Sequence, residues 1–198
     1  MSSVTEVATV AVIGAGGLGR DIAHATALAG YRTILEDILP SSLRKAEYEF
    51  RVNLEQALGS GNITSQQAQS AASRLEYAES IEEAARQADL VIEAVPEELE
   101  SKIEIFILLD KICRPATILV TTSSEADVSQ LASSTYRAER CVGLRFVPRG
   151  QKTRRIEIVK GRETSDETLV SASSLARKLI GEVAVVEASA FFPSEQPN

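Results

Sequence analysis

The 198-residue chain is poor in residues that mark several large protein classes: it has no tryptophan, one histidine and two cysteines. Two cysteines are too few for a disulfide framework, so we expect Cys113 and Cys141 to be reduced thiols in the core. No apolar run approaches the roughly 20 residues of a membrane span, and the first residues lack the basic segment and apolar core of a signal peptide. These absences predict a soluble protein of the cytoplasm without a membrane partner.

Positive charge is also scarce, since 21 Lys and Arg stand against 28 Asp and Glu and give a net charge of −7. Nucleic acids and anionic membranes are bound by basic faces, so we expect neither as a partner. Hydrophobic residues make up 44% of the chain and charged residues 25%, which is ordinary for a globular domain. We expect one domain over residues 1–188 that acts on a small molecule, a tail over 189–198, and no metal site.

A glycine-rich turn near the N-terminus is the most informative feature that is present. The apolar segment 10–13 runs directly into Gly14-x-Gly16-x-x-Gly19, and a helix is expected over 20–29. In a dinucleotide-binding turn, Gly14 permits the tight turn, Gly16 lets the backbone approach a pyrophosphate, and Gly19 allows helix and strand to pack closely. The helix N-terminus then offers N–H groups to the phosphates. The expected cofactor-binding residues of this turn are Gly14, Gly16, Gly17, Leu18 and Gly19.

A carboxylate follows the second expected strand. The apolar segment 33–35 ends at Glu36 and Asp37, and Asp37 lies eighteen residues beyond Gly19. A carboxylate in this place accepts hydrogen bonds from the ribose diol of NAD and repels the 2′-phosphate of NADP. Strand, turn, helix and acid together predict an NAD site; the alternative is a tight turn with a purely structural role.

The rest of the chain alternates between strand and helix patterns. A polar segment over 40–72 contains two helical patterns that break at 59–62, and Thr64 is the expected cap of the second. The alternation predicts an α/β fold, a Rossmann-type doubly wound, mainly parallel sheet with a helical hairpin inserted after strand 2. Further strands are expected at 75–78, 89–95, 116–120, 140–147, 156–159 and 183–186, and further helices at 80–87, 97–113, 127–132 and 165–180.

The order of these motifs resembles the N-terminal, NAD-binding domain of the L-3-hydroxyacyl-CoA dehydrogenase family. The resemblance extends over about residues 7–192, and besides the glycine turn it rests on segments 88–97, 139–144 and 156–159. It implies hydride transfer between a 3-hydroxyacyl-CoA-like secondary alcohol and NAD, as in fatty acid metabolism, and an acyl-CoA-like substrate. The alternative is a catalytically inactive NAD-binding sensor or assembly module.

The resemblance also implies contacts beyond the turn. A Glu and a Lys after the fourth strand hold NAD in relatives, and they match Glu97 and Lys102. The alternative for each of these two residues is an exposed charge on the first turns of a helix, without a cofactor contact. Ser124 matches a family serine that contacts substrate and cofactor, and is otherwise a helix cap.

The catalytic pair of the family is altered in this chain. Relatives use a histidine as the base for the 3-hydroxyl and a glutamate that orients it; the glutamate matches Glu157, but Arg145 stands at the histidine position. A guanidinium has only donors and stays protonated near neutral pH, so Arg145 cannot be the general base. We therefore expect activity to be weak or lost, with Arg145 and Glu157 forming an ion pair across two neighbouring strand ends. The alternative is that Arg145 stabilises an oxyanion or a carboxylate while another base acts.

Other family positions differ as well. Pro148 and Thr122 replace two asparagines, and we expect this chain to lack the helical second domain, which closes over the substrate and dimerises in relatives. We expect the surface that it covers elsewhere to support a homo-oligomer, capped by Phe191 and Phe192. The only histidine, His24, lies among alanines of the first helix and is expected to be a packing residue.

A basic segment borders the expected active site. Between Arg145 and Arg162 there are seven basic residues and one acid, Glu157. The segment is either an anion site, for the phosphates of a CoA-like ligand or for an acidic partner, or a solvated face that discourages pairing at the edge of the sheet.

Overall fold

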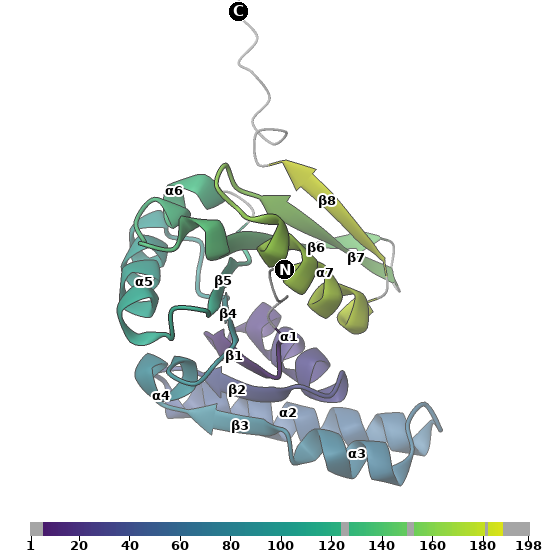
Figure 1. The fold of residues 1–198 in the computed structure, drawn as a ribbon. Coiled ribbons are helices and arrows are strands. Elements are labelled where there is room, and N and C mark those ends of the chain that lie inside the picture. Colours follow the sequence, from purple (N-terminus) through teal and green to yellow (C-terminus); the bar gives the residue numbers. More distant parts are fainter. Residues whose placement is uncertain (1–5, 124–126, 150–152, 181, 188–198) are drawn as a thin grey trace, which may run out of the picture.

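Eight strands form one mainly parallel sheet in the computed structural model, which describes residues 6–123, 127–149, 153–180 and 182–187. The strand order is β3-β2-β1-β4-β5-β6-β7-β8 (Figure 1), and only the β6–β7 pair is antiparallel. The chain therefore fills the sheet outward in both directions from β1 and β4. The strands are β1 (Thr9–Ile13), β2 (Arg32–Glu36), β3 (Leu75–Ala78), β4 (Leu90–Glu93), β5 (Ile118–Thr121), β6 (Cys141–Arg149), β7 (Thr153–Lys160) and β8 (Val183–Glu187).

Helices cover both faces of the sheet, because alternate residues of a strand point to opposite faces. Val10 and Val12 of β1 belong to the core that contains α1, α2, α3 and α7, whereas Ala11 and Ile13 belong to the core that contains α4, α5 and α6. The predicted doubly wound α/β fold is confirmed. The helices are α1 (Gly17–Leu28), α2 (Pro40–Gly59), α3 (Ser65–Ala72), α4 (Ile81–Ala85), α5 (Leu99–Ile112), α6 (Val128–Ala132), the 3-10 turn η1 (Ala138–Arg140) and α7 (Asp166–Ile180).

The helical hairpin after β2 forms as predicted. The Thr64 hydroxyl accepts a hydrogen bond from the Gln67 N–H at 3.2 Å, and the Gln67 side chain accepts one from the Thr64 N–H at 2.8 Å. His24 packs against the hairpin: its ring stacks on Phe50 at 4.6 Å between centroids, and Nε2 lies 3.2 Å from the Ala46 carbonyl. Burial lowers the pKa of His24. The histidine is therefore a packing residue, as expected.

Several element ends differ from the predicted ones. Helix α1 begins at Gly17, three residues early, because Gly16 is extended (φ −63°, ψ −177°) and its carbonyl already accepts the Arg20 N–H at 3.0 Å. Strands β6 and β7 are longer than predicted because they pair with each other. Arg145 and Glu157 consequently face each other in mid-strand, and the expectation that they sit at strand ends is wrong.

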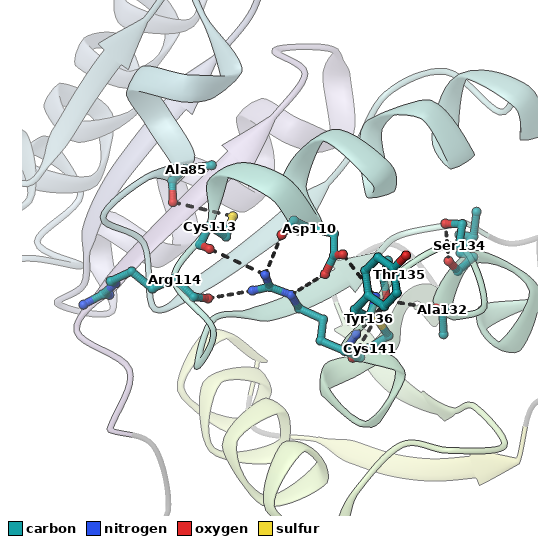
Figure 2. A network of polar contacts seen from close by, with 11 residues as sticks. Ala85, Asp110, Cys113, Arg114, Ala132, Ser134, Thr135, Tyr136 and Cys141 are labelled. Carbon is teal, nitrogen blue, oxygen red and sulfur yellow. Dashed lines mark hydrogen bonds and ion pairs between the residues drawn. The ribbon is translucent and has the colours of Figure 1, made fainter.

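The buried side chain of Arg137 holds the segment that leads into β6. Arg137 is 8% exposed; its Nε donates to Asp110 Oδ1 at 2.7 Å, and its Nη atoms donate to the carbonyls of Asp110 at 2.7 Å and Arg114 at 2.6 Å. Asp110 and Arg114 lie at the end of α5 and just beyond it (Figure 2). The guanidinium therefore ties the end of α5 to the segment that leads into η1 and β6.

The two cysteines behave as the composition predicts. Cys113 and Cys141 are free and buried, and burial raises the pKa of Cys113 to about 11 and that of Cys141 to about 12. Within the described part of the chain, no helix is both long and apolar enough to cross a membrane.

Candidate functional site

A cavity of about 1260 Å³ opens along the carboxyl ends of the strands. Its lining comes from the ends of β1, β2, β3, β4 and β5 or the residues just after them, from mid-strand residues of β6, and from residues of α1, α2, α4 and α5. Ligands of open α/β sheets bind in such a place, next to the point where the strand order reverses. Seven of the predicted site residues line it: Gly14, Gly16, Gly17, Leu18, Asp37, Glu97 and Arg145.

The glycines of the turn are required for different reasons. Gly14 has φ +100°, and a Cβ there would lie 2.9 Å from the Ala94 carbonyl oxygen. A Cβ on Gly19 would lie 1.9 Å from the Gly14 oxygen, so this residue serves helix–strand packing. Gly16 has an ordinary extended backbone, and a Cβ there meets nothing within 4 Å. Packing of the chain therefore does not require a glycine at position 16, whereas close approach of a ligand to the protein backbone does.

Two carboxylates follow one another at the end of β2. Asp37 is held against the turn: its Oδ2 accepts the Ala15 N–H at 2.9 Å and its Oδ1 accepts the Leu39 N–H at 2.9 Å. Each carboxylate oxygen can accept a further hydrogen bond, so Asp37 retains acceptor capacity toward the cavity. Glu36, 5% exposed, lines the same cavity; burial, together with the charge of Asp37, raises its pKa to about 7.

A fully buried carboxylate that sequence reasoning missed lies behind the β4 end of the cavity. Glu93 is 0% exposed; its Oε1 accepts Lys102 Nζ at 2.7 Å and the Val95 N–H at 2.9 Å, and its Oε2 accepts the Thr121 hydroxyl at 2.7 Å. The Lys102 side chain is 1% exposed. Lys102 thus points inward from α5 and supports the loop after β4 from behind. The sequence signal for this buried pair is a charged residue inside an apolar strand, because a buried carboxylate requires a partner.

Glu97 continues this network to the cavity surface. Its Oε1 accepts the Ser123 hydroxyl, and its Oε2 lies 3.9 Å from Lys102 Nζ. The Ser123 N–H donates to the Thr121 hydroxyl at 3.1 Å, and the Glu97–Ser123 contact connects the segment after β4 to the end of β5. The predicted site residue Ser124 lies outside the described residues.

Arg145 and Glu157 form an ion pair. Arg145 Nη1 lies 3.5 Å from Glu157 Oε2, and the two side chains are 13% and 9% exposed. Arg155 hydrogen-bonds the other oxygen of Glu157. Arg145 lines the cavity together with Thr122. The side chains of four other residues of interest lie outside the described set: Pro148, Arg149, Lys152 and Arg154.

The family model for the NAD-binding domain of 3-hydroxyacyl-CoA dehydrogenase matches residues 9–190. The chain belongs to the 3-hydroxyacyl-CoA dehydrogenase family. The resemblance drawn from the sequence motifs is thereby confirmed, and so is NAD as the cofactor of this domain.

Relatives of the NAD-binding domain include two bacterial proteins. The chain is 32% identical over 180 residues to a probable 3-hydroxybutyryl-CoA dehydrogenase of Bacillus subtilis, covering 91% of the chain and 62% of that protein. It is 33% identical over 178 residues to the 3-hydroxybutyryl-CoA dehydrogenase of Bradyrhizobium diazoefficiens, covering 90% of the chain and 60% of that protein. The chain thus spans about three-fifths of the length of these 3-hydroxyacyl-CoA dehydrogenase relatives.

Solved structures of the family have the same fold. The crystal structure of 3-hydroxybutyryl-CoA dehydrogenase from Escherichia coli superposes with a TM-score of 0.87 at 30% identity, covering 93% of this chain and 39% of that one. The (S)-3-hydroxybutyryl-CoA dehydrogenase of Ralstonia eutropha also gives a TM-score of 0.87, at 27% identity, covering 95% of this chain and 66% of that one.

Proposed function

We propose that the cavity binds NAD(H), and that hydride transfer with 3-hydroxyacyl thioesters is slow because Arg145 stands where the family has its base. The observation that carries this proposal is the contrast between the two ends of the cavity. The glycine turn and Asp37 offer an open cradle at one end, and a guanidinium ion-paired with Glu157 occupies the other.

The cofactor contacts are proposed for individual groups. The N–H groups at the start of α1, over Gly17 and Leu18, face the pyrophosphate, which approaches closest at Gly16. The Asp37 carboxylate accepts hydrogen bonds from the ribose hydroxyls at the β2 end of the cavity. The contact with Ser123 orients Glu97, and the Glu97 carboxylate accepts a hydrogen bond from a hydroxyl of the second ribose. Lys102 acts from behind the wall by holding Glu93 and the loop after β4.

The catalytic proposal concerns proton transfer. NAD, when bound, takes up or delivers the hydride. A proton must also leave the substrate hydroxyl, and Arg145 has no lone pair to accept it. Loss of a positioned base costs roughly 10²–10⁴ in rate. We therefore expect the domain to bind its cofactor while turnover of thioester substrates falls by about that factor.

The direct test is a fluorescence titration with NADH followed by addition of acetoacetyl-CoA. Saturable NADH binding with oxidation at least about 100-fold slower than ordinary enzymatic rates supports the proposal. Oxidation at ordinary rates contradicts the catalytic part. Lack of NADH binding contradicts the whole.

Two further expectations stay predictions. Self-association of the chain is tested by light scattering at micromolar concentration, where a monomer counts against it. A cytoplasmic location also stays a prediction, since relatives include proteins named as peroxisomal.

A further inference from the structure

The side chain of Glu36 points to the face of the sheet that α4 and α5 cover. Ile34, two residues earlier in β2, belongs to the core on that face, and residues two apart in a strand point the same way. The register partners of Glu36, which are Ile13 in β1 and Ala78 in β3, belong to the same core. Glu36 is 5% exposed and lines the cavity. It therefore places a carboxyl where the apolar core meets the cavity.

The cavity wall on this face of the sheet is formed by apolar side chains. Ile81 of α4, Val95 after β4 and Ile105 of α5 line the cavity, and each packs against the core to which the neighbours of Glu36 belong. A flat, weakly polar ring gains favourable burial against such side chains. Glu36 thus offers a polar group at the edge of a surface that suits a planar ring.

The Glu36 carboxyl has hydrogen-bonding capacity that the chain leaves unused. Burial, together with the charge of Asp37, raises its pKa to about 7, and the Gly14 N–H offsets only part of this rise. Within the described ranges of the chain, no side chain donates a hydrogen bond to this carboxyl. A carboxylate can accept about four hydrogen bonds. A hydrogen-bond donor on a ligand would therefore stabilise the ionised group.

The proposed place of NAD brings such a donor to this part of the cavity. The ribose proposed to bind Asp37 carries the adenine ring, and Glu36 is the residue before Asp37. Adenine is planar; its ring nitrogens accept hydrogen bonds, and its exocyclic amino group donates them. An ionised carboxylate only accepts hydrogen bonds. The amino group is therefore the part of the base that matches Glu36.

We infer that the Glu36 carboxylate accepts a hydrogen bond from the exocyclic amino group of the adenine of NAD(H), and thereby selects this base. The inference rests on the proposed function, because the ribose at Asp37 brings the base to Glu36. It gives Glu36 a role in cofactor specificity that is separate from the glycine turn and from the ribose contact of Asp37.

Fluorescence titrations at pH 8 with two dinucleotides test this inference. One is NADH, and the other is reduced nicotinamide purine dinucleotide, which lacks only the amino group of the base. We expect the wild type to bind NADH at least about tenfold more tightly, because hydrogen bonds to charged groups are the strong ones. Glu36→Leu has no acceptor and is expected to bind the two dinucleotides with Kd values within about twofold of each other.

Two matched controls test the other acids of the cavity wall. Glu79 and Glu82 line the same cavity but are exposed. Glu79→Leu and Glu82→Leu each remove one negative charge, as Glu36→Leu does, and both are expected to keep the preference of the wild type for NADH. The melting temperature of each variant reports on its folding.

A conservative variant keeps the test decisive if Glu36→Leu does not fold. Glu36→Gln retains a carbonyl oxygen but loses the charge, and a neutral acceptor forms a weaker hydrogen bond than a carboxylate does. Its preference for NADH over the purine dinucleotide is expected to be at least about threefold smaller than that of the wild type.

Three results would overturn the inference: equal binding of the two dinucleotides by the wild type, an unchanged preference in the Glu36 variants, or loss of the preference in Glu79→Leu or Glu82→Leu. Saturable NADH binding without any preference overturns this inference alone and leaves the proposed function standing. Absence of NADH binding by the wild type contradicts the proposed function and this inference with it.

Discussion

Lys102 Nζ lies 2.7 Å from Glu93 Oε1, with the two side chains 1% and 0% exposed. The lysine also donates to the Val95 carbonyl at 3.2 Å, so one ammonium group links the end of β4, the loop that follows and α5. Since that loop carries Glu97 to the cavity, the buried pair supports this wall of the cavity from behind.

Removal of the lysine should therefore destabilise the fold. Lys102→Met leaves Glu93 buried without its cation, and we expect a loss of about 3–5 kcal/mol in the free energy of unfolding, measured with urea. The double variant Lys102→Met with Glu93→Gln should recover part of this loss, because no buried charge remains. The control Lys45→Met, on an exposed side chain, should change stability by less than about 0.5 kcal/mol. A double variant that is less stable than the single one would contradict the assignment.

The buried Arg137 should be far less replaceable than an exposed arginine. Arg137→Lys loses the fork that reaches Asp110 and two backbone carbonyls at once. We expect a loss of about 2–4 kcal/mol in thermal or urea unfolding, since buried polar groups are left unsatisfied. Arg32→Lys is the control, because the Arg32–Glu76 pair is about half exposed and should contribute less than about 1 kcal/mol. Equal losses in the two variants would count against a role for the Arg137 network in holding β6.

Glu36 should make stability fall as the pH rises. Its pKa is raised from 4.5 to about 7, so the folded state binds a proton that the unfolded state has lost, and the stability gained from it disappears between about pH 4.5 and pH 7. Glu36→Gln should be the more stable protein at pH 8, by on the order of 2 kcal/mol, and should match the wild type at pH 4. Urea unfolding at the two pH values measures this. A variant that is no more stable than the wild type at pH 8 would show that Glu36 is not held in an apolar setting.

Much of the fold follows from local patterns in the sequence. The strand–helix alternation and the spacing of Gly14, Gly16 and Gly19 predict a doubly wound sheet that binds a ligand at the carboxyl ends of its strands. Thr64 marks the start of α3. These features depend on residues that are close together in the chain. The alternation of side chains along a strand and the backbone freedom of a glycine are local properties, so they can be predicted without knowledge of tertiary contacts.

The parts of the site that depend on register could not be predicted in the same way. Glu93 signals a buried partner, but only the packing of α5 brings Lys102, nine residues later, to it. The mid-strand position of Arg145 opposite Glu157 follows from the antiparallel pairing of β6 and β7, which the composition of two apolar segments does not reveal. The sharing of Glu157 by Arg155 is a consequence of the same register.

The measurement that tests the account most directly is an NADH fluorescence titration of the wild type, Gly16→Ala and Gly59→Ala. A Cβ meets nothing within 4 Å at either glycine, so neither substitution should lower the melting temperature, but only Gly16 lines the cavity. We predict saturable binding to the wild type and to Gly59→Ala, and a Kd at least about tenfold higher for Gly16→Ala, because its methyl group occupies the place of the pyrophosphate. Equal affinity in all three proteins, or no saturable binding to the wild type, would contradict the claim that this cavity holds the cofactor.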